Sequence, residues 1–333
     1  MVHKPGIVYA NTTDGMELPI IDITHPEFSL PDDAASIAAL TADYKTTEEK
    51  QAKTPVFVRR LFMKLGSRRS ELLRALLEPA GSFLGGLTTY IMKLGPTNLP
   101  DGFNSSIDQR IVGSPHARFV RLRLQHVARM LADGIEPLLA ETADAPLHFI
   151  DIGGGPAMDS INALLLLKKS HPNLLARPIH IHVCDLDTKG PAFGANAVRA
   201  LLARGAPLAG LNVTLDASSY NWNDATALDS LLATIRTNAI IAVSSEGALF
   251  EYGTDEAIVA NLQVLYSRAR LVVGSVTSDQ PIRREQIKAT RFHLIPRGLA
   301  GFRPLAEQTG YTIARFETTP LSDQVLLLPN WLY

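Results

Sequence analysis

The sequence predicts an α/β fold organised around a mostly parallel sheet, and two observations support this. From residue 147 onward, short apolar runs alternate with segments of helical composition, which is typical of parallel strands joined by crossover helices. The first run, Leu147–Ile152, leads directly into three glycines, and an apolar run that stops at glycine indicates a buried strand ending in a tight turn. Ligands of such sheets bind outside the carboxyl ends of the strands.

Each later segment fits one element of this alternation. Helices are expected at residues 158–170, 190–205, 224–237, 255–269 and 303–309. Strands are expected at residues 178–187, 211–218, 238–245, 270–278, 310–319 and 322–333, which together with the first run gives seven strands. The last two strands follow each other closely in the sequence.

The part of the chain before the first strand has a different composition. Residues 1–45 are rich in Pro, Asp and Thr, with residues 18–28 as the only strand-like piece, and we expect extended or loosely packed chain there. Helical composition broken by Pro and Gly follows up to residue 94, and a turn-rich loop occupies residues 95–116. A long amphipathic helix is then expected within residues 117–144.

Composition excludes several classes of function. The formal net charge of −1 gives no overall field that would attract nucleic acid. No apolar run is long enough to cross a bilayer, and the N-terminus lacks the layout of a signal peptide, so a cytoplasmic protein with no membrane partner is expected. The single cysteine, Cys184, excludes a disulfide framework, and no histidine pattern predicts a metal site. A small-molecule ligand is favoured, and a homodimer is compatible with the sequence.

The glycine turn and the next strand together indicate a nucleoside site. Gly153, Gly154 and Gly155 allow positive φ and let a ligand approach the backbone closely. Asp185 is the first carboxylate after the apolar residues of the second strand, where an acid can accept hydrogen bonds from ribose hydroxyls. Pro156 removes a backbone N–H that a pyrophosphate would need, so a phosphate-free nucleoside fits better than a dinucleotide.

With DIGGGP at Asp151–Pro156 and the acid of the second strand, the sequence resembles the class I S-adenosylmethionine-dependent methyltransferases over roughly residues 147–333. The resemblance implies a Rossmann-like, seven-stranded, mostly parallel sheet with an antiparallel terminal hairpin. It also implies S-adenosylmethionine (SAM) as the cofactor, and a helical lid formed by residues 1–116 in front of a catalytic domain of residues 117–333.

The resemblance also assigns roles to the two acids and their neighbours. Asp151 belongs to the glycine motif, and Asp185, followed by Leu186, occupies the place of the acid that holds the ribose. The spacing between the two acids is longer than usual in the family because of a loop at residues 171–178, so Asp187 is the alternative ribose acid.

Two further turns are expected to complete the cofactor site. After the third strand, Tyr220 or Trp222 could stack on the adenine, and Asn221 could accept a hydrogen bond from its exocyclic amine. After the fourth strand, Ser244 and Ser245 lie at the level of the cofactor.

The residues that follow the fourth strand are the catalytic candidates. Glu246 could hold an ammonium group of the cofactor or of a substrate, and Tyr252 could present its hydroxyl or its ring face to the sulfonium. This Glu-Gly pair followed by a tyrosine is similar to the corresponding stretch of leucine-carboxyl-type O-methyltransferases.

The function predicted is methyl transfer from SAM to a small molecule. The alternative is a SAM cyclase or lyase, in which the amine of SAM attacks its own γ-carbon, as azetidine-2-carboxylate synthases of this fold do, giving azetidine-2-carboxylate and methylthioadenosine. The absence of a recognisable acceptor motif keeps this alternative open. A nicotinamide enzyme is disfavoured by the GGGP turn, and a non-catalytic binding module is the remaining alternative.

Overall fold

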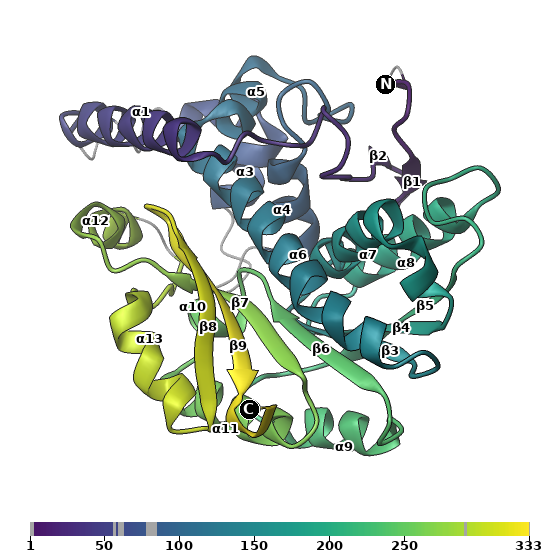
Figure 1. The fold of residues 1–333 in the computed structure, drawn as a ribbon. Helices are drawn as coiled ribbons and strands as arrows, with labels where there is room; N and C mark the ends of the chain where they lie inside the picture. Colours follow the sequence, from purple (N-terminus) through teal and green to yellow (C-terminus); the bar gives the residue numbers. More distant parts are fainter. Residues whose placement is uncertain (1–2, 56–57, 59–62, 78–84, 290–291, 333) are drawn as a thin grey trace.

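The computed structural model describes residues 3–55, 58, 63–77, 85–289 and 292–332. Its centre is a seven-stranded sheet with the strand order β5-β4-β3-β6-β7-β9-β8 (Figure 1). The strands are β3 (Leu147–Ile152), β4 (Pro178–Asp185), β5 (Asn212–Ser219), β6 (Ile240–Ser245), β7 (Leu271–Thr277), β8 (Tyr311–Thr318) and β9 (Ser322–Pro329). Strands β3 to β7 are parallel, and β9 lies antiparallel between β7 and β8. The predicted Rossmann-like sheet with its antiparallel terminal hairpin is therefore confirmed.

Helices cover both faces of the sheet. They are α6 (Pro115–Glu141), α7 (Met158–Ser170), α8 (Lys189–Leu202), α9 (Thr226–Thr234), α10 (Leu249–Tyr252), α11 (Asp255–Tyr266), α12 (Pro281–Ala289) and α13 (Gly298–Glu307), with short 3-10 turns at Pro172–Leu175 and Asn330–Leu332. In β3, Leu147 and Phe149 pack on the side of α6, α7 and α8, whereas Ile150 and Ile152 pack on the side of α9, α11 and α13. Because both faces are buried, four of the six residues of β3 are apolar, and the two polar ones, His148 and Asp151, are buried as well.

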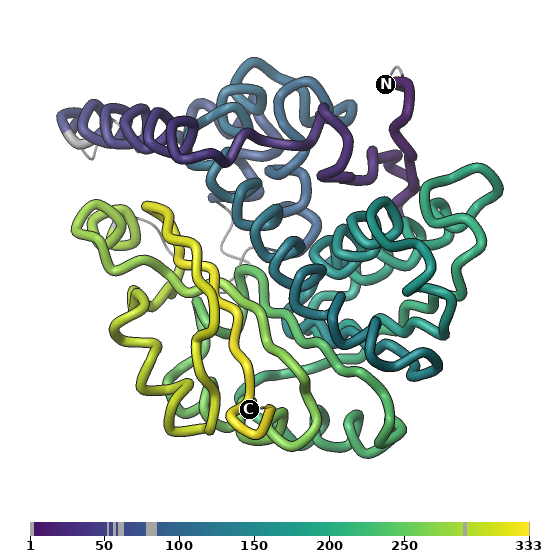
Figure 2. Tube along the Cα trace, viewed as in Figure 1, coloured from purple at the N-terminus to yellow at the C-terminus, as the bar shows by residue number. Residues whose placement is uncertain are grey.

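The N-terminal part is more ordered than the sequence suggested. It contains β1 (Tyr9–Asn11), β2 (Glu17–Pro19), α1 (Ala34–Ala52), α3 (Glu71–Leu77), α4 (Gly86–Lys93) and α5 (Ser106–Gly113). Helix α1 begins well before residue 46 because the carboxylate of Asp33 accepts hydrogen bonds from the backbone N–H groups of Ala35 and Ser36. In Figure 2 the purple and blue N-terminal third gathers along one side of the molecule.

Residues 18–28 belong to the main hydrophobic core, whereas extended or loosely packed chain was expected throughout residues 1–45. Ile21 and Ile23 are buried in the same cluster as Leu147 of β3. Asn162 of α7 fixes this segment, because its side chain donates to the carbonyl oxygen of Ile21 at 2.9 Å and accepts from the N–H of Ile23 at 2.8 Å. The hydroxyl of Tyr90 on α4 also accepts a hydrogen bond from the N–H of Ile21.

The boundary expected between residues 116 and 117 lies inside the first turn of α6. This helix begins at Pro115, and the side chain of Ser114 caps it by accepting from the N–H of Ala117 at 3.2 Å. Within the described ranges, no helix is both long and apolar enough to cross a membrane.

Candidate active site

The glycine turn between β3 and α7 has the backbone that only glycine adopts easily. Gly153 has a φ of +64° and Gly155 a φ of +49°. A Cβ on Gly153 would lie 2.4 Å from the Cβ of Ala248, and one on Gly155 would lie 3.3 Å from the Cα of Gly86 in α4. Gly154 is equally confined, because a Cβ there would lie 2.4 Å from the Cβ of Asp151. The turn is therefore bare backbone held between the sheet and the N-terminal helices.

A cavity of about 810 Å³ opens at this turn. Its walls come from the carboxyl ends of β3, β4 and β6, from α4, α5 and α6 of the N-terminal part, and from α12 and the residues after it. The volume lies within the range of ligand pockets for drug-sized molecules. The cavity therefore occupies the crevice where this type of sheet binds its ligands.

Asp185 lies at the edge of the cavity, at the end of β4. One carboxylate oxygen accepts from the N–H of Gly155 at 2.8 Å, and the other accepts from the N–H of Asp187 at 2.8 Å. Burial raises the pKa of Asp185, while these two donors oppose the rise. Next to it, Leu186 lines the cavity with a side chain that is 61% exposed, which places an apolar surface beside the acid.

Asp187 has a different place from Asp185. One of its oxygens accepts from the N–H of Lys189, and the other accepts from Gly190 at 3.3 Å and from Gly86 at 3.2 Å. It thus starts α8 and ties the first residue of α4 to that helix. Asp187 thus accepts three backbone hydrogen bonds and Asp185 only two, so Asp185 keeps more lone pairs for ribose hydroxyls.

Asp151, Ser244 and Ser245 lie beneath the turn rather than on the cavity wall. Asp151 is fully buried, and one of its oxygens accepts from the hydroxyls of Ser160 and Ser244, at 2.5 and 2.8 Å. Burial, followed by the negative charge of Asp159, raises the pKa of Asp151 well above its usual value. The hydroxyl of Ser245 donates to the carbonyl oxygen of Ile152 at 3.1 Å. These residues support the turn from below.

Of the three residues expected to contact adenine, one lines the cavity and two do not. Trp222 lines the cavity. Tyr220 is buried in the core, where its hydroxyl donates to the side chain of Asn261. Asn221 is exposed and its side-chain oxygen accepts from the N–H of Asn223. Tyr220 and Asn221 are not among the described residues that line the cavity.

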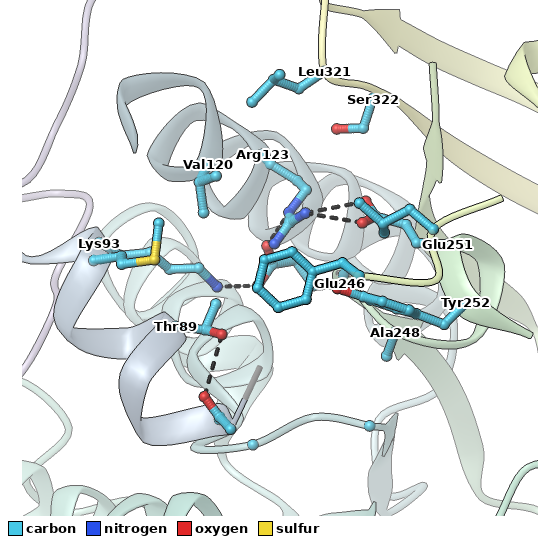
Figure 3. A pocket seen from close by; sticks show the side chains of 18 of the residues that line it. Thr89, Lys93, Val120, Arg123, Glu246, Ala248, Glu251, Tyr252, Leu321 and Ser322 are labelled. Carbon is cyan, nitrogen blue, oxygen red and sulfur yellow. Dashed lines mark hydrogen bonds and ion pairs between the residues drawn. The ribbon is translucent and has the colours of Figure 1, made fainter. Parts of the chain in front are cut away.

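A buried network of charges surrounds Glu246 (Figure 3). Its carboxylate pairs with Lys93 of α4 and with Arg123 of α6, and Arg123 also pairs with Glu251 at 3.0 Å. Burial alone would raise the pKa of Glu246, but the charges of Arg123 and Lys93 outweigh it and lower the pKa to about 2. Glu246 is thus ionised and already neutralised by the protein.

Two other titratable side chains line the same part of the cavity. Burial, and then the negative charge of Glu251, raise the pKa of Tyr252 to about 12. Burial, and then the positive charges of Arg283 and Arg123, lower the pKa of His116 to about 3. At neutral pH the tyrosine is therefore a neutral phenol and the histidine a neutral imidazole. No group of His, Cys, Asp and Glu in the described part of the chain is arranged to hold a metal ion.

Five further residues of the site were not predicted from the sequence: Lys93, His116, Arg123, Glu251 and Arg283. All five lie on helices whose position against the sheet is set by long-range packing, so no local motif marks them. The nearest signal is Arg123 within the amphipathic pattern of α6, where a charge on an otherwise buried helix face requires a partner.

No family model matches the sequence, and no curated protein matches it. Similar solved structures include a magnesium protoporphyrin IX methyltransferase from Synechocystis PCC 6803 with bound S-adenosylhomocysteine (SAH). It is 19% identical, covers 64% of this chain and 87% of its own, and gives a TM-score of 0.43. A putative sarcosine dimethylglycine methyltransferase from Galdieria sulphuraria is 12% identical over 64% of this chain and 87% of its own, with a TM-score of 0.39.

A third similar structure is an O-methyltransferase from neocarzinostatin biosynthesis, in complex with SAH and 1,4-dihydroxy-2-naphthoic acid. It is 19% identical over 65% of this chain, with a TM-score of 0.39, and this chain spans 58% of its length. All three proteins are described as methyltransferases, but similarity at this level does not extend to substrates.

Proposed function

We propose that this protein binds SAM and transfers its methyl group to a small-molecule acceptor. The observation that carries the proposal is the arrangement at the ends of β3 and β4. There, a turn with two positive-φ glycines faces a carboxylate, Asp185, and an exposed apolar side chain, Leu186, in one cavity. This combination suits a nucleoside without phosphates.

The residues present fit the nucleoside half of SAM. Each oxygen of Asp185 accepts one backbone hydrogen bond, which leaves lone pairs for the ribose hydroxyls. Gly153 leaves backbone uncovered where a side chain would fill the space. Leu186 and Trp222 supply apolar surface for the flat base.

SAM, when bound, supplies a methyl group on a positively charged sulfur, which an acceptor takes in an in-line displacement. The chain positions the two partners and excludes water. His116 can accept a hydrogen bond from an acceptor, but an imidazole with a pKa of about 3 is a weak base. An acceptor that is nucleophilic at neutral pH without losing a proton, such as a carboxylate, therefore suits the site.

The binding step is tested by replacing Asp185. Asp185→Ala is expected to weaken SAM binding by about 2 kcal/mol, roughly 30-fold, because hydrogen bonds from a charged acceptor to the ribose are lost. Asp229→Ala, which removes an exposed acid from α9, is the matched control and should bind normally. Unchanged affinity of a folded Asp185→Ala protein in calorimetry would remove Asp185 from the cofactor site.

A second candidate function uses SAM as the only substrate. In it the amine nitrogen bonds to the γ-carbon, the bond from that carbon to sulfur breaks, the amine proton goes to solvent, and azetidine-2-carboxylate and methylthioadenosine result. One observation favours it: among the described cavity residues, Glu246, His116 and Tyr252 have pKa values of about 2, 3 and 12, far from neutral. An α-amine, with an ordinary pKa near 8, needs no strong base to become neutral.

Product analysis separates the two candidates. The purified protein is incubated with SAM alone and with SAM plus a panel of carboxylic acids and amines, and the nucleoside products are resolved by chromatography. Methyl transfer predicts SAH that appears only when an acceptor is added. Methylthioadenosine forming together with azetidine-2-carboxylate, well above the spontaneous rate and without a second substrate, would instead establish the cyclisation, and the absence of both outcomes would contradict both candidates.

A further inference from the structure

Arg283 is a buried cation on the wall of the cavity. It lies in the first turn of α12, which follows the carboxyl end of β7 after a few residues, and it lines the same cavity as Glu251 and Tyr252. Only 7% of its surface is exposed. A guanidinium taken out of water costs several kcal/mol unless a partner compensates it.

Within the protein, this compensation is incomplete. The Nε atom of Arg283 is buried and has no hydrogen-bond partner among the residues that the structure describes. One terminal nitrogen donates to the side-chain oxygen of Gln286 at 3.3 Å, but the hydroxyl of Tyr44 already donates to that oxygen at 2.5 Å. Among the described residues, no carboxylate forms an ion pair with Arg283, whereas Arg123 pairs with two.

The charges around Arg283 do not balance. In the cluster of Lys93, Arg123, Arg283, Glu246 and Glu251, three side chains are positive and two are negative, so one positive charge is left over. The planar fork of a guanidinium matches a carboxylate, which accepts two parallel hydrogen bonds. A single excess charge also matches a carboxylate better than a dianionic phosphate.

We propose that Arg283 is the binding residue for a carboxylate group of a ligand in this cavity. The proposal rests on the proposed function and names the chemical class that it acts on. Two sources are compatible with the same chemistry: the carboxylate of an acceptor molecule, and the carboxylate at the amino-acid end of SAM.

The test compares ligands that differ only in a carboxylate, in wild type and in Arg283→Met. SAH carries the amino-acid carboxylate, whereas methylthioadenosine lacks it; benzoate carries a carboxylate, whereas benzamide is its neutral counterpart. Calorimetry measures all four, with the aromatic pair titrated into protein both free and loaded with SAH. Arg284→Met is the matched control, since the neighbouring Arg284 is 52% exposed.

If Arg283 holds the carboxylate of the cofactor, Arg283→Met weakens SAH about 10-fold to 100-fold and leaves methylthioadenosine unchanged. If it holds that of the acceptor, the wild type prefers benzoate over benzamide and the variant loses this preference, with SAH unaffected. Arg283→Lys keeps the charge without the fork and should give intermediate losses. Affinities of Arg283→Met within twofold of wild type for SAH and benzoate would overturn the proposal.

Thermal melting of the ligand-free protein separates binding from a structural role. Arg283→Met removes a poorly compensated buried cation, so its melting temperature should equal or exceed that of the wild type. A marked fall in melting temperature with unchanged ligand affinities would show that the arginine is a structural element. Failure of the wild type to bind SAH or methylthioadenosine would count against the proposed function alone, because the comparison of benzoate with benzamide still tests Arg283.

Discussion

Replacing Gly153 by alanine tests whether the glycine turn is required by its backbone conformation, by its close packing, or by both. Its φ of +64° costs a residue with a Cβ about 1–2 kcal/mol. The added Cβ would also lie 2.4 Å from the Cβ of Ala248, a distance at which something must move, and overpacking of this kind costs about 1–3 kcal/mol. Gly153→Ala should therefore lower the free energy of unfolding by about 2–5 kcal/mol.

Two further variants separate the two contributions. Gly205 has a φ of +84°, and no atom lies within 4 Å of the place that a Cβ would take there, so Gly205→Ala carries only the backbone cost of about 1–2 kcal/mol. The double variant Gly153→Ala with Ala248→Gly removes the clash but keeps the positive φ. Its stability should lie nearer to that of Gly205→Ala than to that of Gly153→Ala.

Urea denaturation followed by circular dichroism measures these differences as shifts in midpoint at constant slope. SAH titration of the folded variants then reports whether the turn still accepts a ligand, and Gly153→Ala is expected to bind more weakly while Gly205→Ala binds normally. The reasoning is refuted if Gly153→Ala and Gly205→Ala lose the same stability, or if Ala248→Gly gives no rescue.

Three other predictions concern pH, the charge network and the N-terminal part. Burial, and then two neighbouring histidines, lower the pKa of His148 to about 4. Because His148 binds a proton more readily in the unfolded state, the free energy of unfolding should fall by about 2 kcal/mol between pH 6.5 and 4. The urea midpoint of His148→Asn should depend less on pH than that of the wild type, whereas His171→Asn, at an exposed position, should behave like the wild type. Lys93→Met and Glu246→Gln should each destabilise by about 3 kcal/mol, but their double variant by less than the sum, which a thermodynamic cycle checks. A chain starting at residue 117 should show no cooperative melting, because it lacks the N-terminal share of the core; a sharp calorimetric transition would contradict this.

The parts of the site that the sequence predicted are those governed by local rules. Glycines at the end of an apolar run predict a turn with positive φ, and Gly153 and Gly155 have it. The end of β4 was predictable because strand patterns place the first acid after the apolar residues, and Asp185 lies there beside the turn. The start of α1 was missed, because helical chain was expected only after residue 45, although Asp33 directly precedes the helix as a cap.

The remaining parts depend on how distant segments pack. Lys93 and Glu246 are 153 residues apart, and no period or motif connects them. Tyr220 and Trp222 belong to the same turn, but Tyr220 is buried in the core and Trp222 lines the cavity. Sequence patterns do not predict which of two aromatic residues in a turn enters the core. Burial of residues 18–28 was missed because loose packing was expected from the composition of residues 1–45 as a whole, while Asn162 of α7 supplies hydrogen bonds that exposed chain would take from water.

Charge balance connects Arg283 to the choice between the two candidate reactions. SAM carries a net positive charge, and it would enter a cavity in which the charged cluster around Arg283 has one excess positive charge in surroundings of low polarity, where repulsion is strong. An acceptor carboxylate relieves this, and its methylation turns a cation and an anion into two groups without charge. Without an acceptor, the same excess charge disfavours the ammonium form of the SAM amine. Ring closure needs the neutral amine, so the excess charge favours it. The reaction is then decided less by a dedicated base than by whether a second carboxylate fits beside Arg283.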